Sequence, residues 1–382
     1  MERLNGVVVW CAVLALGAVN AAQAVPVPVD PSIAAFSIFD TGGSLDTIAG
    51  FEMGGLEVDA SGKVFVLGAD FPGSFGGGPA SVVQLFGSTG LGTAAPVGLP
   101  VAMTLNTRGY DLTMNPADGK MYVAGTLDPL GVMGAPVPGI HGLDPAGAML
   151  PVTFAVTTGS ATTSGLTFNP AGTIATLSTD GIPPLTGPTL PLAGGVYTVP
   201  AGGPEVLLAG LGPLPIGAPG PGDDHVITLD GRTIYAGDGS HDLWDVSGGT
   251  GTVSTLIDLD LTPAAPVLGF GGSRATLDPW SGDIFYGHAL IPGSVGIARV
   301  KADGSGATIF ATGFTGLRDF DIGPASSGGG AMSLYAVEVA TGTGIGTIYE
   351  FELTHMAVPE PATAALGLLA AAGLVWRTRR RG

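Results

Sequence analysis

The sequence predicts an all-β protein, a six-bladed β-propeller in which each blade holds four strands. A unit made of a strand, a tight turn and a second strand recurs six times, roughly 50 residues apart, and a third strand follows each copy. The 66 glycines and 31 prolines suit the many turns of such a fold. A seventh blade, a pair of β-sandwiches and an irregular β-solenoid remain open as alternatives.

Each copy of the unit has two apolar residues two positions apart before its turn, which is the period of a strand with one buried face. In five copies an Asp or Asn opens the turn and a glycine supplies positive φ. The copies span 55–68, 110–125, 165–178, 226–237, 274–287 and 319–338. The apolar pairs are Leu56/Val58, Leu112/Met114, Leu166/Phe168, Ile227/Leu229, Ala275/Leu277 and Phe320/Ile322. The turn residues are Asp59/Gly62, Asn115/Gly119, Asn169/Gly172, Asp230/Gly231 and Asp278/Gly282.

The third strands are expected at 81–87, 139–144, 195–200, 242–247, 296–301 and 347–353. Fourth strands follow most of them, for example at 204–210, 252–258 and 307–313. The last unit has no clear fourth strand, and we expect the segment from Leu45 to Phe51 to supply it and so remove the open edges. The strand from Phe36 to Asp40 is then left over, and either extends the last blade or belongs to a seventh.

The first 24 residues have the pattern of a secretory signal peptide. Arg3 precedes an apolar stretch from Val7 to Val19, and Ala22-Gln23-Ala24 forms a small-residue cleavage site, so residues 1–24 are expected to be removed during export by the Sec machinery. The single cysteine, Cys11, lies inside that stretch. The mature chain then has no cysteine, which excludes disulfides, a thiolate nucleophile and a cysteine metal site.

The C-terminal residues 356–382 form a three-part tail after the expected propeller domain, 25–355. The triplet Pro359-Glu360-Pro361 is followed by an uncharged run, 362–376, and by a basic end, 377–382, that contains Arg377, Arg379, Arg380 and Arg381. As a helix the 15-residue run would span roughly 22 Å, which is short for the ~30 Å hydrocarbon core of a membrane. The arginines would stay cytoplasmic under the positive-inside rule.

This tail resembles the PEP-CTERM sorting signal of Gram-negative bacteria. The resemblance covers only the tail and implies that an exosortase cuts near the triplet after transient attachment to the inner membrane through the transmembrane helix. It also implies a final place at the cell surface or in the extracellular, exopolysaccharide-rich matrix. A plain tail anchor or a buried C-terminal helix is the alternative interpretation.

The chain is strongly acidic, with a formal net charge of −18. After removal of both ends, 8 basic and 30 acidic residues remain, a net charge of −22. Such a surface repels nucleic acid, so nucleic acid is not an expected partner. Binding of cations, or simple solubility, suits this charge better.

A few charged residues just before the first-strand apolar pairs, from four of the six units, are the candidate ligand-binding site. In a closed ring they would converge near the mouth of the central channel, where they could bind a cation or an anionic sugar, or pair with one another. They are Asp111, Asp224, His225, Arg274, Arg318 and Asp319. Glu57 and Asp321 lie further along their strands, and threonines at the matching positions favour packing over catalysis: Thr113, Thr167, Thr228 and Thr276.

The repeat pattern is similar to that of NHL-type or lactonase-type propellers, although no signature motif is present. The lactonase resemblance implies that carboxylates in this region hold a divalent metal, and calcium is the cation we consider. Otherwise no cofactor is expected. The remaining histidines, His141, His241, His288 and His355, do not cluster in the sequence, so each is interpreted as a loop or surface residue.

These features favour a non-enzymatic function: an exported, surface-sorted propeller that binds or scaffolds the matrix, with exopolysaccharide or another surface protein as partner. Long loops rich in Pro and Gly, such as 126–139 and 180–195, could form an adhesive face. The alternative is a metal-dependent hydrolase or lyase that acts through Asp111, Asp224, His225 and Asp319. A purely structural spacer is a third possibility.

Overall fold

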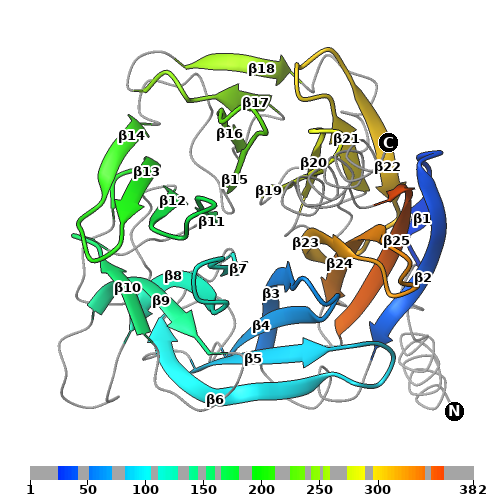
Figure 1. The fold of residues 1–382 in the computed structure, drawn as a ribbon, viewed down its shortest axis with the longest axis horizontal. Coiled ribbons are helices and arrows are strands. Elements are labelled where there is room, and N and C mark those ends of the chain that lie inside the picture. The colour runs from blue at the N-terminus through cyan, green and yellow to red at the C-terminus, as the bar shows by residue number, and fades with distance from the viewer. Residues whose placement is uncertain are drawn as a thin grey trace, which may run out of the picture.

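The computed structural model shows a ring of six β-sheet blades around a central axis (Figure 1). This confirms the predicted all-β propeller with four-stranded blades, and the described residues form no seventh blade. The structure describes residues 25–41, 51–70, 82–104, 111–127, 137–144, 152–159, 165–179, 192–210, 224–236, 242–249, 253–258, 273–288, 296–339 and 346–356. The predicted leader, the sorting tail and the two Pro/Gly-rich loops therefore lie largely outside them. Within these ranges, no helix has the length and apolar character needed to cross a membrane.

The first three blades follow the chain in order, with the first strand innermost and the fourth at the rim. Blade 1 consists of β3 (Phe51–Val58), β4 (Val64–Asp70), β5 (Val82–Ser88) and β6 (Ala95–Thr104). Blade 2 consists of β7 (Thr113–Met114), β8 (Met121–Leu127), β9 (Val137–Leu143) and β10 (Val152–Val156), and the end of β6 pairs with the end of β8, which joins blades 1 and 2 in one sheet. Blade 3 consists of β11 (Leu166–Phe168), β12 (Ile174–Thr179), β13 (Gly195–Pro200) and β14 (Val206–Gly210).

The last three blades include both ends of the ring. Blade 4 consists of β15 (Asp224–Ile227), β16 (Thr233–Ala236), β17 (Asp242–Asp245) and β18 (Ser254–Asp258). Blade 5 consists of β19 (Ser273–Leu277), β20 (Ile284–His288), β21 (Gly296–Val300) and β22 (Ala307–Thr312), with β1 (Val27–Pro28) added outside β22. Blade 6 consists of β23 (Leu317–Pro324), β24 (Ala331–Val339) and β25 (Gly346–Met356), and its outer strand is β2 (Ile33–Thr41).

The ring is closed by the N-terminal strand β2, which corrects the predicted closure. β2 pairs antiparallel with β25 from Ile33 opposite Leu353 to Thr41 opposite Thr347. β2 therefore takes the place in blade 6 that was predicted for the segment from Leu45 to Phe51, of which only Phe51, the first residue of β3, lies among the described residues. The strand from Phe36 to Asp40 extends the last blade, one of the two places considered for it.

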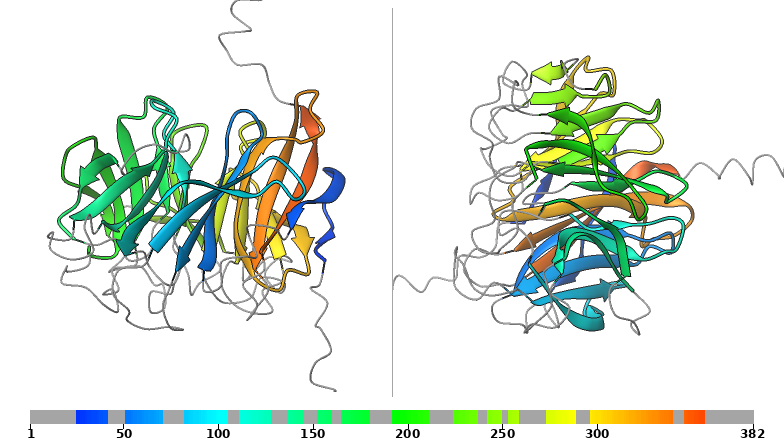
Figure 2. Two further views of the ribbon diagram at one scale, coloured as in Figure 1. Left: turned by 90° about the horizontal axis from the view of Figure 1, so that it is seen from below. Right: turned by 90° about the vertical axis from the view of Figure 1, so that its left-hand side faces the viewer.

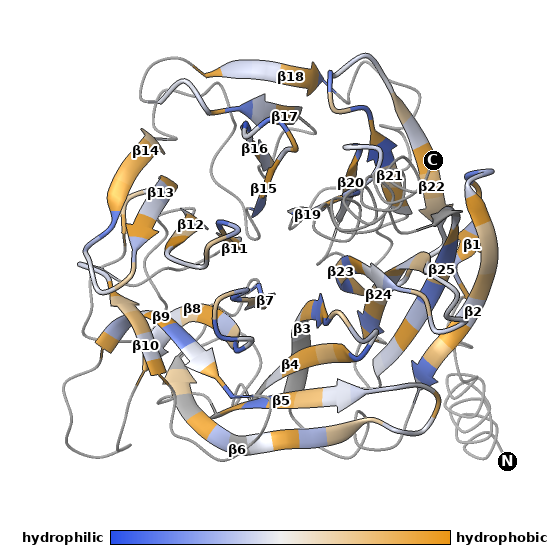
Figure 3. Cartoon of the chain, viewed as in Figure 1, coloured by the Kyte–Doolittle hydropathy of each residue, from blue (hydrophilic) through white to orange (hydrophobic). Residues whose placement is uncertain are grey.

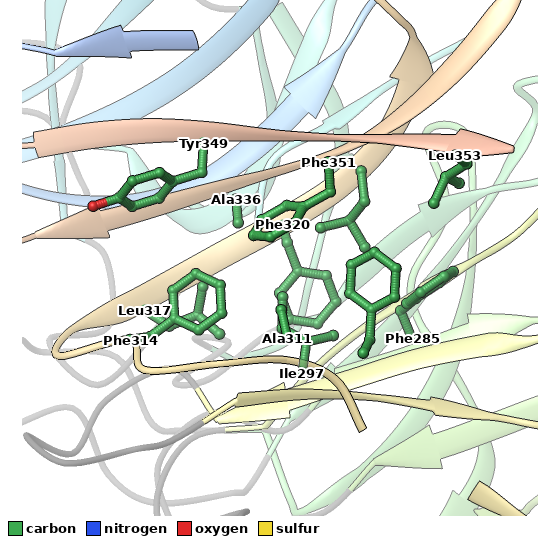
Figure 4. Close-up of a cluster of buried hydrophobic side chains, with 12 residues drawn as sticks. Phe285, Ile297, Ala311, Phe314, Leu317, Phe320, Ala336, Tyr349, Phe351 and Leu353 are labelled. Atoms are coloured by element: carbon green, nitrogen blue, oxygen red, sulfur yellow. The ribbon is translucent and has the colours of Figure 1, made fainter. Parts of the chain in front are cut away.

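The core lies between neighbouring blades, where the apolar faces of two sheets meet. Between blades 5 and 6 the buried side chains include Phe285, Phe314, Phe320 and Phe351 (Figure 4). Phe36 of β2 packs against Phe351 with ring centroids 4.9 Å apart, so the closing strand also contributes to this core. Burial of each such ring contributes roughly 1.5–3 kcal/mol.

The turn in blade 4 starts two residues earlier than the sequence pattern predicts. Thr228 donates its N–H to the carbonyl oxygen of Arg232 (2.8 Å), so Thr228 takes the place expected of Asp230. Leu229 therefore lies in the turn and is 63% exposed, which makes the predicted buried pair Ile227/Leu229 wrong.

Candidate functional site

A cavity of about 230 Å³ lies on the axis, where the innermost strands of all six blades converge. Its charged lining residues are Glu57, Asp111, Asp224, Asp319 and Asp321, together with His225. Among the other lining residues are Thr113, Thr167 and Thr276. The structure thus brings four of the six predicted site residues, Asp111, Asp224, His225 and Asp319, to one cavity.

Three of these aspartates join neighbouring blades in the same way. One carboxylate oxygen accepts the N–H of the next residue, and the other accepts an N–H from the innermost strand of the following blade. The bonds between blades run from Leu166 N–H to Asp111 (2.8 Å), from Ala275 N–H to Asp224 (2.9 Å) and from Leu56 N–H to Asp319 (2.6 Å). The bonds within blades come from Leu112, His225 and Phe320. Both oxygens of each carboxylate therefore accept hydrogen bonds from backbone N–H groups.

The aspartates occupy blades 2, 4 and 6, and the matching positions of blades 1, 3 and 5 hold Gly55, Gly165 and Arg274. Gly165 has a steric reason to be glycine, since a Cβ there would lie 2.2 Å from Oδ1 of Asp224. A Cβ on Gly55, whose φ is +68°, would lie 3.0 Å from the Cβ of Leu112. These glycines allow the innermost strands to approach closely.

Arg274 places a positive charge beside this ring of carboxylates and lowers the pKa of Asp111, Asp224 and Asp319. Its Nε lies 3.6 Å from Oδ1 of Asp319, and the Arg274 side chain is 2% exposed. The same Nε donates to the carbonyl oxygen of Arg318 (3.3 Å). Arg318 thus takes part through its backbone, and neither arginine lines the cavity.

Glu57 and Asp321 form a second layer two residues further along their strands. Asp321 accepts the N–H of Val58 (3.1 Å) and the hydroxyl hydrogen of Thr276 (3.1 Å). Glu57 accepts a hydrogen bond from the backbone of Met114. The sequence shows these acids, but it does not show that their strands bring them beside Asp111 and Asp319. Thr228, expected at the matching place in blade 4, lies in the turn instead, and Val226 lines the cavity.

Burial raises the pKa of all five carboxyl groups. Loss of water is the largest cause in each case, and charges of neighbouring carboxylates add to it for Glu57, Asp111 and Asp319. The pKa of Asp319 rises to about 7 even though Arg274 opposes the shift, and that of Asp321 rises to about 6. Some of these carboxyl groups are therefore protonated near neutral pH, which lowers the net negative charge of the cavity.

His225 occupies the strand position at which blades 1, 2 and 3 place a leucine. Its Nδ1 lies 3.1 Å from the hydroxyl oxygen of Ser178 in blade 3. Its Nε2 is buried and has no hydrogen-bond partner among the described residues. Burial lowers the pKa of His225 to about 4, so the imidazole is neutral at physiological pH.

His141 is not the loop or surface residue expected, because it is buried in β9. Its Nε2 lies 3.0 Å from the carbonyl oxygen of Val137, and burial lowers its pKa to about 4. His241, and the side chains of His288 and His355, lie outside the described residues.

The residues around the cavity do not fit the divalent metal that the lactonase resemblance implies. Within the described ranges, no three His, Cys, Asp or Glu side chains are placed to hold one metal ion. The aspartates that would be ligands, Asp111, Asp224 and Asp319, already bind backbone N–H groups through both oxygens. In this structure these carboxylates link neighbouring blades through hydrogen bonds.

Comparison with known proteins shows the fold. No family model matches the chain, and no curated protein matches it. A solved structure of a mutant α-L-arabinofuranosidase from Fusarium graminearum, in complex with an iminosugar inhibitor, matches with a TM-score of 0.52 and 9% identity. The match covers 82% of this chain and 96% of the arabinofuranosidase chain. The complex of the GH93 α-L-arabinofuranosidase of the same fungus with arabinobiose matches with a TM-score of 0.52 and 11% identity, over 82% of this chain and 97% of its own. At such identities the likeness shows a shared propeller fold alone.

Proposed function

We propose that this chain is an exported, surface-sorted β-propeller that binds or scaffolds polysaccharide of the extracellular matrix. The observation that carries the proposal is the position of the tail. The last strand, β25, ends at Met356, and the Pro-Glu-Pro triplet starts at Pro359. All six blades are complete before the triplet begins, so cleavage near the triplet takes no strand from the ring.

The cavity supports a non-catalytic function over the hydrolase or lyase alternative. That alternative needs Asp111, Asp224 and Asp319 to act on a metal or a substrate, whereas these carboxylates hold the backbone of neighbouring blades. The arabinofuranosidase with the same fold was solved with arabinobiose, and a carbohydrate-related function suits this chain as well. That likeness concerns the fold, so the proposal rests on the tail and the complete ring.

The sorting part of the proposal is tested in a Gram-negative host that has an exosortase. We expect the full chain to be shortened at its C-terminus and found at the cell surface or in the medium. A variant with Pro359→Ala, Glu360→Ala and Pro361→Ala should keep its tail and stay with the inner membrane. The matched control replaces two prolines of the expected 180–195 loop, Pro183→Ala and Pro184→Ala, and should behave as the wild type. Normal processing of the triplet variant would overturn the proposal.

The binding part is tested separately by co-sedimentation of the processed protein with the exopolysaccharide of the same host. We expect the protein to pellet with the polymer and to stay in solution without it. A protein that is sorted correctly but never pellets with the polymer would leave the sorting intact and contradict polysaccharide binding.

A further inference from the structure

The two ends of the ring leave from neighbouring blades but on opposite faces of the disc. Val27 pairs with Thr312, at the end of β22, so the N-terminus lies on the face where β22 ends. Met356 pairs with Ala331, directly after the tight turn of blade 6, so β25 ends on the other face. Figure 2 shows β1 and the end of β25 at opposite edges of the same side of the ring.

The segments that join these ends to the predicted membrane-bound parts are short. Residues 20–26 separate the predicted apolar stretch of the leader from β1, and residues 357–361 separate β25 from the predicted apolar run of the tail. Even fully extended, these segments reach about 24 Å and about 17 Å, whereas the eleven residues of β25 span roughly 33 Å between the faces. A disc lying flat could bring only one end to a membrane, but a disc standing on edge brings both.

The rim between the two ends has the chemistry of a lipid contact. We define the N-terminal rim as residues 25–38, and its exposed aliphatic side chains are Val25 (53%), Val27 (56%), Val29 (50%) and Ile38 (44%). Figure 3 shows the hydrophobic colouring along β2. The charged residue in this rim, Asp30, has a side chain only 8% exposed, and it accepts the N–H of Ser32 and faces Arg299. An acidic protein thus presents an uncharged edge here, which lowers repulsion from an anionic membrane.

We infer that the N-terminal rim lies against the lipid surface while both ends of the chain are held in the membrane, so that the disc stands on edge. This inference rests on the export and sorting proposed above. The position of the ends and the character of the rim are independent observations, and both select the same side of the disc. Hydrolysis of the Ala24–Val25 bond, with water supplying the new carboxylate and amine, would release the first of the two attachments.

The test uses the full chain with Cys11→Ser, so that an introduced cysteine is unique, and with Ala24→Leu to retain the leader. Single cysteines replace Val27 or Ile38 on the N-terminal rim. Matched control cysteines replace Val152 or Val206, exposed valines on outer strands of blades 2 and 3. Each is labelled with a fluorophore and reconstituted into phosphatidylethanolamine–phosphatidylglycerol vesicles that carry a headgroup spin label.

We expect quenching by the spin label to be several-fold stronger at positions 27 and 38 than at positions 152 and 206. Equal quenching at all four positions, or stronger quenching at 152 and 206, would overturn the inference. Resistance to trypsin confirms that each variant is folded, which exposed substitutions should allow. Failure of the chain to float with vesicles would instead contradict membrane attachment itself, and the orientation with it.

Discussion

At the scale of single residues, aspartates alternate with other residue types from blade to blade around the central cavity. Asp111, Asp224 and Asp319 reach from the even-numbered blades into the blades that follow them, and each offers its carboxylate to a backbone N–H. Blades 1 and 3 hold a glycine that leaves space, such as Gly165 beside Asp224, whereas blade 5 holds Arg274. A buried carboxylate held by two N–H donors is costly to disturb, because its loss leaves both donors without partners.

The substitution Gly165→Ala tests this arrangement. Its Cβ would lie 2.2 Å from Oδ1 and 2.8 Å from Cα of Asp224, so the strand must shift, and overpacking of this kind costs about 1–3 kcal/mol. We expect urea unfolding to show that loss. The control is Gly306→Ala, where a Cβ meets nothing within 4 Å. Equal stability of the two variants would contradict the steric account of Gly165.

At the scale of elements, strand β2 holds the ring together on both of its sides. It pairs with β25 of blade 6, and Asp40 at its end accepts N–H groups of Gly92 (2.7 Å) and Ala94 (3.0 Å) in blade 1. The hydroxyl of Ser88 also donates to Asp40, whose residue is fully buried. The N-terminal strand therefore joins the last blade to the first.

The substitution Asp40→Ala should open this junction. It leaves the N–H groups of Gly92 and Ala94 and the hydroxyl of Ser88 without their acceptor, at a cost of roughly 1–3 kcal/mol for each buried group that water cannot reach. We expect a lower free energy of unfolding and earlier proteolysis within residues 25–41. The exposed carboxylate of Asp303 serves as control, and Asp303→Ala should change stability little. If the Asp40→Ala variant were as stable as the wild type, pairing with β25 alone would suffice to close the ring.

The sequence was sufficient to predict the blades but not their closure. Turn residues such as Asp59 and Gly62, with alternating apolar neighbours, mark the start of a blade locally, and the predicted turns were confirmed in blades 1, 2, 3 and 5. Closure depends on which edge a distant strand reaches, and both Phe36–Asp40 and Leu45–Phe51 have suitable composition. The Thr228 turn was placed wrongly because Asp230, two residues on, offers the same capping oxygen, and the Thr228 hydroxyl accepts the N–H of Arg232 instead.

The residues of the cavity, like the fold, could be predicted only where the local sequence determines them. The first layer of acids could be predicted, because each precedes a strand that must run beside the axis. Glu57 and Asp321 belong to blades 1 and 6, which are adjacent only in the closed ring, so their coupling depends on the closure. His225 was predicted as a site residue, but the sequence does not show that it replaces a core leucine between blades 3 and 4.

At the scale of the whole molecule, the buried carboxyl groups make stability depend on pH. An acid whose pKa is higher in the folded than in the unfolded chain binds its proton more tightly in the folded state. Ionising such a buried carboxyl group lowers the stability of the folded state. This loss is absent below the pKa of the unfolded chain, near 4, and is complete above the pKa of the folded chain, about 7 for Asp319 and about 6 for Asp321. The contribution of these carboxyl groups to stability should therefore fall as pH rises from 4 to 7, whereas His225 and His141, whose pKa values are lowered to about 4, contribute in the opposite direction between pH 4 and 6.5.

We expect the free energy of unfolding, measured in urea, to depend on pH differently in the wild type and in Asp319→Asn. Relative to the variant, the wild type should lose a few kcal/mol between pH 4.5 and pH 7.5, because an amide does not titrate and the carboxyl group of Asp319 does. The same pH dependence in the wild type and the variant would contradict the raised pKa of Asp319.

The pairing of β2 with β25 also affects how the chain can fold. Thr41 and Thr347, opposite each other in that pair and linked through their hydroxyl groups, are 306 residues apart in the sequence. Contacts of such high contact order form late and slowly, because a very long loop must close before they are gained. β2, which is synthesised before all six innermost strands, must therefore wait, unpaired with β25, until nearly the whole propeller has followed it.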